Sequence, residues 1–280
     1  MHPRYRVFVD FDGTLVQPNV AILLVEKFCP DGDRVAHEVD ELLHTGKITL
    51  REAWERQAAL LPADRVAEMT AWAREAIPLR EGAREFLTLL KHHQVPTAIV
   101  SGGLDFYIQA VLDREGFDLP FVSDTLETHS DGSVRVLHPY GHPTCRLCGI
   151  CKAHVVQSKD PNQELTVFLG DGSTDRYGAE VADIVFARHR LKTYCERSGV
   201  AFVPFENFPE VTAQLERWLT GTDAPPIRSS HGLASSLCPI SRDLAEASAR
   251  RPSQVRVGSR HSSPSGTPLT AGATSATEGA

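Results

Sequence analysis

Two carboxylates close an apolar run near the amino terminus, in the segment Val7-Phe8-Val9-Asp10-Phe11-Asp12-Gly13-Thr14-Leu15. On an extended chain, side chains two residues apart lie on the same side, so Asp10 and Asp12 should share one face. The run predicts a buried strand with both acids at its carboxyl end, where open α/β sheets bind their ligands. Carboxylates this close repel each other, so the pair calls for a cation or a shared proton. The alternative is a strand that simply stops at a polar turn.

Three further segments carry polar groups at the end of a strand or the start of a helix. Ala98-Ile99-Val100-Ser101-Gly102-Gly103 is an apolar run that ends in a hydroxyl and two glycines. Lys152 opens the helical segment Ala153–Ser158, and Val167-Phe168-Leu169-Gly170-Asp171-Gly172-Ser173-Thr174-Asp175 is another strand that ends in acids. With four such motifs in this order over residues 5–215, the chain resembles the haloacid dehalogenase-like phosphohydrolases.

Strand-like runs alternate with helical segments along the chain. The expected strands are Tyr5–Val9, Pro96–Val100, Phe121–Ser123, Leu165–Leu169 and Ile184–Ala187. The expected helices are Glu81–His93, Phe106–Glu115, Arg176–Ala182 and Glu206–Leu219. This alternation predicts an α/β fold, a Rossmann-like parallel sheet with helices on both faces. Residues 1–16 and 79–220 would form this catalytic core.

Residues 17–78 form a long insertion between the first two strands, without a run of strand strength. Four helices are expected there, at Ala21–Phe28, Val35–Leu43, Leu50–Leu60 and Val66–Ala76. Thr49 with Glu52 is a capping-box pattern at the start of the third. An insertion directly after the first motif resembles the helical cap of the phosphoserine-phosphatase branch. We expect it to act as a lid, because a phosphoryl site gains from excluding water; a bundle that only stabilises the sheet is the alternative.

Residues 124–151 form a second insertion, with a β-hairpin and a cysteine-rich segment. Thr125–Thr128 and Val134–Leu137 flank an Asp-Gly turn, which is a hairpin signal. Three cysteines follow at three-residue spacing, with two histidines upstream: Cys145, Cys148 and Cys151 after His138 and His142. This composition predicts a zinc site in which His142 or His138 is the fourth ligand. Buried thiols around a tight turn are the alternative.

The family resemblance implies a role for each acid. Asp10 would be the nucleophile that forms an aspartyl-phosphate. Asp12 would be the general acid and base, and its backbone carbonyl would face a metal ion. Asp171 would bind Mg²⁺ together with Asp10, since magnesium suits all-oxygen ligation. Asp175 would hold a metal-bound water or fix the position of Lys152.

The resemblance also assigns the groups that bind phosphate. Ser101 offers a hydroxyl, and Gly102 and Gly103 would let backbone N–H groups approach a phosphate at a helix N-terminus. Lys152 would offset the negative charge of Asp10 and of the phosphate. The expected partner is therefore a small phosphomonoester, and the expected cofactor is Mg²⁺.

The cysteine-rich pattern C-x-x-C-G-x-C-K narrows the resemblance to one subgroup. It is similar to the methionine-salvage phosphatases that act on 2-hydroxy-3-keto-5-methylthiopentenyl-1-phosphate. Phosphoserine phosphatase is the alternative, but that enzyme places a Glu after the first motif, where this chain has Gln17 and Asn19. Thr174 before Asp175 also departs from its fourth motif. A third hypothesis is a zinc-stabilised binding protein whose acidic site is vestigial.

Composition argues against several other classes of protein. The 280 residues carry 29 basic and 36 acidic side chains, a net charge of −7. An acidic chain is a poor partner for nucleic acid, and the longest strongly apolar run, Val20–Val25, is too short to span a bilayer. No signal-peptide core precedes the first strand, so we expect a cytoplasmic protein with reduced thiols. Residues 221–280 lack aromatic side chains, and we expect them to be disordered.

Overall fold

The computed structural model describes residues 4–45, 47–157 and 164–227. A seven-stranded sheet runs through the molecule in the order β4-β3-β2-β1-β5-β6-β7. The strands are β1 (Tyr5–Val9), β2 (Thr97–Leu104), β3 (Phe121–Thr128), β4 (Val134–Leu137), β5 (Leu165–Gly170), β6 (Ile184–Ala187) and β7 (Val203–Pro204). Neighbouring strands are parallel except for β3 and β4, which are antiparallel. The predicted α/β architecture is confirmed.

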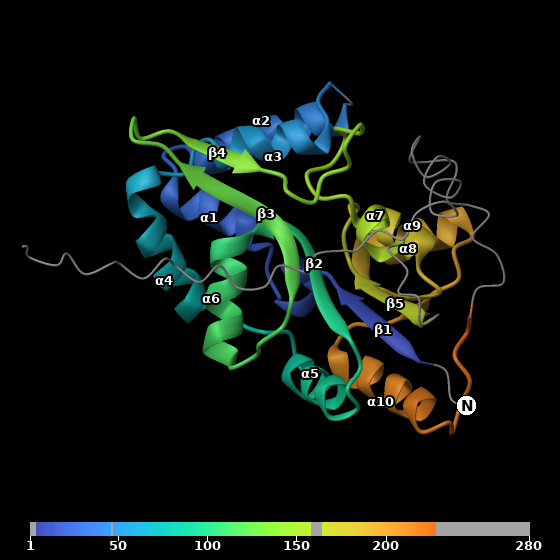
Figure 1. Ribbon diagram of the computed structural model, residues 1–280. Helices are drawn as coiled ribbons and strands as arrows, with labels where there is room; N and C mark the ends of the chain where they lie inside the picture. Colours follow the sequence, from blue (N-terminus) through green and yellow to red (C-terminus); the bar gives the residue numbers. More distant parts are fainter. Residues whose placement is uncertain (1–3, 46, 158–163, 228–280) are drawn as a thin grey trace, which may run out of the picture.

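Helices cover both faces of the sheet, as Figure 1 shows. One face packs against α5 (Ala83–His92), α6 (Asp105–Glu115) and α10 (Phe208–Leu219), and the other against α7 (Lys152–Gln157), α8 (Arg176–Val181) and α9 (His189–Ser198). The central strand β1 shows how the sequence produces this layering. Val7 and Val9 belong to the first apolar cluster, whereas Phe8 belongs to the second. A strand buried on both faces needs such a continuous apolar run.

The insertion after β1 is helical, as predicted. Its helices are α1 (Val20–Phe28), α2 (Gly32–His44), α3 (Leu50–Ala58) and α4 (Val66–Ala76), with a short turn η2 (Ala63–Arg65) before the last. The capping box of Thr49 and Glu52 is present at the start of α3. Helices α1, α2 and α3 gather with β4 at one end of the molecule, away from α5 and α10 (Figure 1).

The four cap helices are not equally tied to the core. Residues of α1 and α4, among them Leu24 and Met69, share one apolar cluster with the sheet. Arg114 of α6 donates to the carbonyls of Arg74 and Ile77, at 2.6 Å each, and so pins the end of α4. Residues of α2 and α3, among them Val39 and Ala53, form a small separate apolar cluster, although Ala58 of α3 belongs to the main one.

Several boundaries differ from the sequence prediction. Strand β3 continues from Phe121 to Thr128, so the core strand and the first hairpin strand are one element. Helix α9 and strand β7 were not predicted, since α9 buries only Leu191 and Cys195 of its ten residues and carries a weak apolar pattern. The predicted disorder of the tail falls mainly on residues 228–280, outside the described residues.

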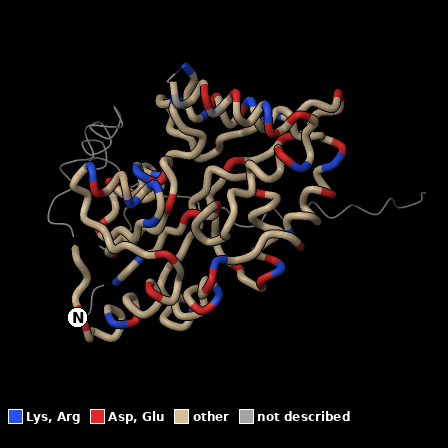
Figure 2. The backbone as a smooth tube through the Cα atoms, turned by 180° about the vertical axis from the view of Figure 1, so that it is seen from behind, with Lys and Arg blue, Asp and Glu red and all other residues tan. Residues whose placement is uncertain are grey.

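Charged residues of both signs are interspersed along the described chain (Figure 2). Acidic and basic positions follow one another within the same helices, as in the i,i+4 pair Arg34–Glu38 of α2. Among the residues that the structure describes, no helix has the length and apolar character needed to cross a membrane.

Candidate active site

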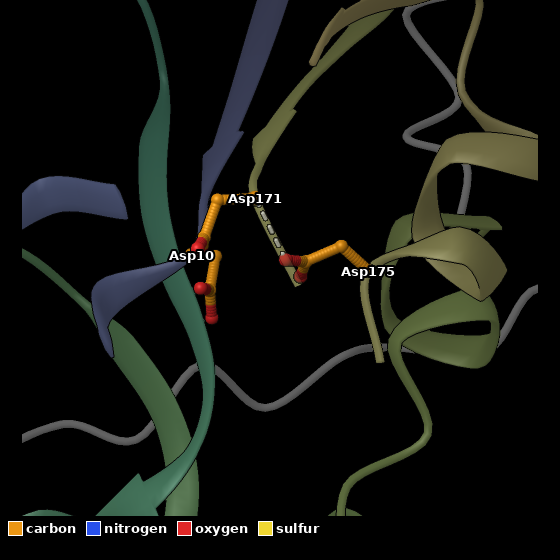
Figure 3. A group of neighbouring side chains, drawn as sticks. All are labelled: Asp10, Asp171 and Asp175. Atoms are coloured by element: carbon orange, nitrogen blue, oxygen red, sulfur yellow. Dashed lines mark hydrogen bonds between the residues drawn. The ribbon is translucent and has the colours of Figure 1, made fainter. Parts of the chain in front are cut away.

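The acidic residues of the first and fourth motifs meet at the carboxyl edge of the sheet. Asp10 directly follows β1, Asp171 directly follows β5, and Asp175 precedes α8. One oxygen from each of the three carboxylates lies within 4.8 Å of the other two, and Figure 3 shows the three side chains turned toward a common centre. In the described part of the chain, no other group of three or more His, Cys, Asp and Glu residues converges in this way.

Lys152 connects two of these acids. Its Nζ lies 2.5 Å from Oδ1 of Asp10 and 2.6 Å from Oδ1 of Asp175, and its side chain is 2% exposed. Burial disfavours the charged ammonium, but the two carboxylates outweigh that effect and raise the pKa of Lys152. Lys152 is therefore a fixed positive charge beside Asp10.

The contacts of Asp175 are those of a positioning group. Oδ1 accepts the bond from Lys152, and Oδ2 accepts from the backbone N–H groups of Asp171 and Gly172, at 2.9 and 2.8 Å. The first of these two bonds is the dashed line in Figure 3. Of the two roles expected for Asp175, these contacts correspond to the one that fixes Lys152.

Asp10 and Asp171 have carboxylates that lack a full counter-charge. Burial raises the pKa of Asp10 well above its ordinary range, Asp175 and Asp171 raise it further, and Lys152 acts in the opposite direction. Burial and Asp175 likewise raise the pKa of Asp171, to which Thr14 donates a 3.0 Å hydrogen bond. Crowded carboxylates with a deficit of positive charge form a donor set that suits a hard divalent cation.

Asp12 occupies a different environment from Asp10. Its Oδ2 accepts a 2.6 Å hydrogen bond from the hydroxyl of Tyr107 and lies 3.4 Å from Ser101 Oγ. Its Oδ1 accepts from the backbone N–H of Val20, the first residue of α1, at 2.8 Å. Desolvation raises the pKa of Asp12 to about 6, although the bonds from Tyr107 and Val20 act the other way. A carboxyl group with this pKa can exchange a proton near neutral pH.

Gly102 and Gly103 lie in strand β2 and not in the first turn of a helix, which differs from the sequence prediction. Strand β2 continues through both residues to Leu104, because the extended backbone pairs Leu104 with Asp124 of β3. Ser101 Oγ accepts the backbone N–H of Gly103 at 3.0 Å. Helix α6 begins only at Asp105.

Arg80 and Arg188 bind the loop that follows Asp10. No role was predicted for either residue from the sequence. Arg80 is 8% exposed; its Nε donates to the carbonyl of Thr14 at 2.9 Å and its Nη2 to that of Gly13 at 2.6 Å. Arg188 Nη1 donates to the Gly13 carbonyl at 2.8 Å. Arg188 directly follows β6, so its position at the carboxyl end of a parallel strand was the signal that could have identified it. Tyr107 had no such signal.

A cavity of about 770 Å³ opens over these groups. Asp10, Asp12 and Asp171 line its floor, together with Ser101 and Gly102. The cap lines its opposite side with apolar residues that include Ile22, Val39, Leu43, Leu50 and Trp54. The core thus supplies a charged end and the cap an apolar end, which suits a substrate with the same polarity.

Among the described residues, the ligand atoms of the predicted zinc site do not converge as a metal ion requires, although His142, Cys145, Cys148 and Cys151 line one small pocket. His142 Nδ1 instead faces the backbone N–H groups of Thr144 and Cys145, at 3.3 Å each. Both ring nitrogens of His138 face carboxylates, Asp124 at 2.8 Å and Glu55 at 3.0 Å. The zinc prediction is therefore not supported: both nitrogens of His138 face carboxylates, and Nδ1 of His142 faces backbone groups. The cysteines are half-buried.

The sequence is similar to a known family of hydrolases. The family model for haloacid dehalogenase-like hydrolases matches residues 7–180. Two relatives, from Bacillus mycoides (strain KBAB4) and Bacillus anthracis (strain A0248), are called 2-hydroxy-3-keto-5-methylthiopentenyl-1-phosphate phosphatase. They are 27% and 28% identical over 218 residues, which cover 76% of this chain and 97% of theirs.

Solved structures share the architecture at lower identity. A phospho-aspartyl intermediate analogue of phosphoserine phosphatase has a TM-score of 0.58 and 19% identity, and the match covers 77% of this chain and 99% of that one. A probable phosphoserine phosphatase from Vibrio cholerae has a TM-score of 0.58 at 20% identity, over 78% of this chain and 66% of that one. These matches show a common fold.

Proposed function

Because the chain belongs to the haloacid dehalogenase-like hydrolases, we propose that this phosphatase cleaves a small organic phosphomonoester through an aspartyl-phosphate on Asp10. The observation that carries the proposal is the pairing of Asp10 with Lys152 at 2.5 Å beneath the cavity, beside Asp171. A nucleophilic carboxylate, a fixed positive charge and a second carboxylate for a cation are the groups that phosphoryl transfer requires.

The two acids of the first motif, Asp10 and Asp12, would have different roles in the reaction. The free oxygen of Asp10 attacks phosphorus, and its new P–O bond forms as the bond to the leaving oxygen breaks. Asp12, whose pKa of about 6 keeps a fraction of it protonated near neutral pH, gives its proton to that oxygen. Asp12 then takes a proton from water, which attacks phosphorus, releases inorganic phosphate and regenerates Asp10. Tyr107 holds Asp12 in place for both steps.

The cofactor we propose is Mg²⁺, held by Asp10, Asp171 and the backbone carbonyl of Asp12. Asp175 is committed to Lys152 and to two backbone N–H groups, so it would act on the cation only through its neighbours. When bound, a divalent cation neutralises charge on the phosphoryl oxygens. The chain itself contributes the positive charge of Lys152, whose Nζ lies 2.5 Å from Asp10 Oδ1.

The substrate we propose is a methionine-salvage type of enol phosphate, the class named for the Bacillus relatives. The apolar end of the cavity, with Leu50 and Trp54, suits a thioether-bearing chain. Gln17 and Asn19 line the cavity near Asp12 and offer amides where an amino-acid phosphatase needs a carboxylate. Phosphoserine phosphatase is the second candidate, favoured by the shared fold.

Release of inorganic phosphate from a panel of phosphomonoesters, with and without Mg²⁺, tests the proposal. Asp10→Asn should lower turnover by about 10⁴-fold or more, because an amide cannot form the acyl-phosphate. Asp131→Asn, the same change in the exposed hairpin turn, is the control and should match the wild type. More than a tenth of wild-type activity in Asp10→Asn would exclude the nucleophile.

Equal or faster turnover of phosphoserine than of the enol phosphate would favour the second candidate. We expect kcat/KM for the enol phosphate to be higher by at least ~10-fold, about 1.4 kcal/mol of transition-state binding.

A further inference from the structure

Asp124 is a buried carboxylate that the chemistry above does not use. It lies in β3, opposite Leu104 of β2, is 1% exposed, and borders the cavity. Within the described protein, neither of its oxygens has an aligned hydrogen-bond donor. A buried acceptor without a donor is destabilising, and more so when it is charged. A ligand in the cavity is a natural source of the missing donor.

His138 is the polar neighbour of Asp124 within the protein. Its Nδ1 lies 2.8 Å from Asp124 Oδ1, and its Nε2 lies 3.0 Å from Glu55 Oε1. Carboxylates only accept hydrogen bonds, and the contact between His138 Nδ1 and Asp124 Oδ1 is close but is not aligned as a hydrogen bond. Burial raises the pKa of Asp124, whereas His138 and Arg51 favour its ionised form. Asp124 therefore has a polar neighbour at Oδ1 but no aligned donor among the described residues.

The loop with Cys148 and Gly149 closes over this pair. A Cβ atom at Gly149 would lie 2.3 Å from Asp124 Oδ2 and 2.7 Å from His138 Nδ1. Only a residue without a side chain leaves room for the two groups. The glycine of the C-x-x-C-G pattern thus has a packing role here, and both Cys148 and Gly149 line the same cavity as Asp124.

Asp124 stands where the core meets the cap. His138, which contacts Asp124, also contacts Glu55 of α3. The same helix contributes Leu50 and Trp54 to the apolar end of the cavity. Asp10 marks the phosphate end. A ligand that reaches from Asp10 to α3 would present the middle of its carbon chain to Asp124.

We propose that Asp124 accepts a hydrogen bond from a hydroxyl or enol group on the substrate and thereby selects phosphomonoesters with such a donor between the phosphate and an apolar tail. This inference rests on the proposed function and extends it to the substrate. A neutral donor fits this position better than an ammonium group, because Arg51 already acts on Asp124 as a positive charge.

Synthetic substrates test the assignment on the wild-type chain alone. With Mg²⁺ present, kcat/KM for 2-hydroxypentyl phosphate should exceed that for pentyl phosphate by at least ~10-fold, the effect of one hydrogen bond to a charged acceptor. 2-Methoxypentyl phosphate should gain nothing, since its ether oxygen cannot donate. Equal kcat/KM for the hydroxy and methoxy compounds would overturn the proposal, and so would a preference for 2-aminopentyl phosphate.

Variants assign the effect to one residue. The hydroxy-to-pentyl ratio of kcat/KM should fall in Asp124→Asn and approach ~1 in Asp124→Ala, which has no acceptor. Glu127→Gln, on the same strand with a side chain 43% exposed, should keep the wild-type ratio. An unchanged ratio in a folded Asp124→Ala protein would refute the assignment, and if that variant does not fold the wild-type series decides.

Different experimental results would refute this inference and the proposed function. If no probe releases phosphate, p-nitrophenyl phosphate included, the proposed function is refuted, and this inference with it. If the probes are hydrolysed without discrimination, the phosphatase assignment stands and only the role of Asp124 is lost.

Discussion

A methyl group added at Gly103 should displace the candidate acid Asp12 while leaving the nucleophile in place. A Cβ atom there would lie 1.8 Å from Tyr107 Oη and 2.5 Å from Asp12 Oδ2. Ordinary contact begins at 3.4 Å, so the hydroxyl must retreat by 3.4 − 1.8 = 1.6 Å. That movement breaks the 2.6 Å hydrogen bond between Tyr107 and Asp12.

The magnitude follows from two costs. A hydrogen bond to a charged group contributes about 1.5–3 kcal/mol, and an extra carbon in a packed site costs about 1–3 kcal/mol. Gly103→Ala should therefore lower the free energy of unfolding by about 2.5–6 kcal/mol, which corresponds to a decrease of roughly 10 °C in Tm for a chain of this size. Loss of a positioned acid should also reduce turnover of an alkyl phosphate by about 10²–10⁴-fold.

Thermal unfolding followed by circular dichroism, and turnover of two substrates, check this prediction. Gly102→Ala is the stability control, because its Cβ would meet only Ile150 Cγ2, at 3.8 Å; its Tm should stay within about 2 °C of the wild type. Gly103→Ala should harm an alkyl phosphate more than p-nitrophenyl phosphate, whose leaving group departs without a proton. A Gly103→Ala protein that melts and turns over alkyl phosphate like the wild type would refute this reasoning.

Three more predictions concern the same site. Lys152→Met leaves Asp10 and Asp175 buried without their shared counter-charge, so unfolding free energy should drop by about 3–5 kcal/mol and turnover should be lost; a wild-type denaturant midpoint would contradict this. Arg80→Lys keeps the charge but loses the guanidinium that binds two carbonyls of the first motif loop. The free energy of unfolding should fall by about 2 kcal/mol, and turnover should be slower. Full activity would show that the loop keeps its conformation without Arg80. Asp12 donates only when protonated, and its pKa is about 6, so kcat/KM for an alkyl phosphate should fall roughly tenfold per pH unit above that value; a flat profile between about pH 6 and 8 would exclude this acid.

Local sequence predicted most elements of the fold. Strands Tyr5–Val9 and Ile184–Ala187 have the bounds expected from their apolar runs, because a strand buried on both faces must be apolar throughout. The polar helix α9 was not predicted, since only Leu191 and Cys195 form its buried face. Strand β2 runs past Ser101 because pairing with β3 keeps its glycines extended, and that constraint comes from another part of the chain.

The chain alone determined that Asp10 and Asp171 lie together at the sheet edge, since residues that follow parallel strands must meet there, whereas Lys152 was predicted from the family resemblance. Tertiary structure decided what surrounds them. Tyr107 reaches Asp12 across 95 positions of sequence, and only the packing of α6 brings the two together. His138 has the spacing of a metal ligand, yet the fold sets both its nitrogens against carboxylates. Spacing specifies which groups are near along the chain, whereas the direction in which each side chain points depends on elements that are distant in sequence.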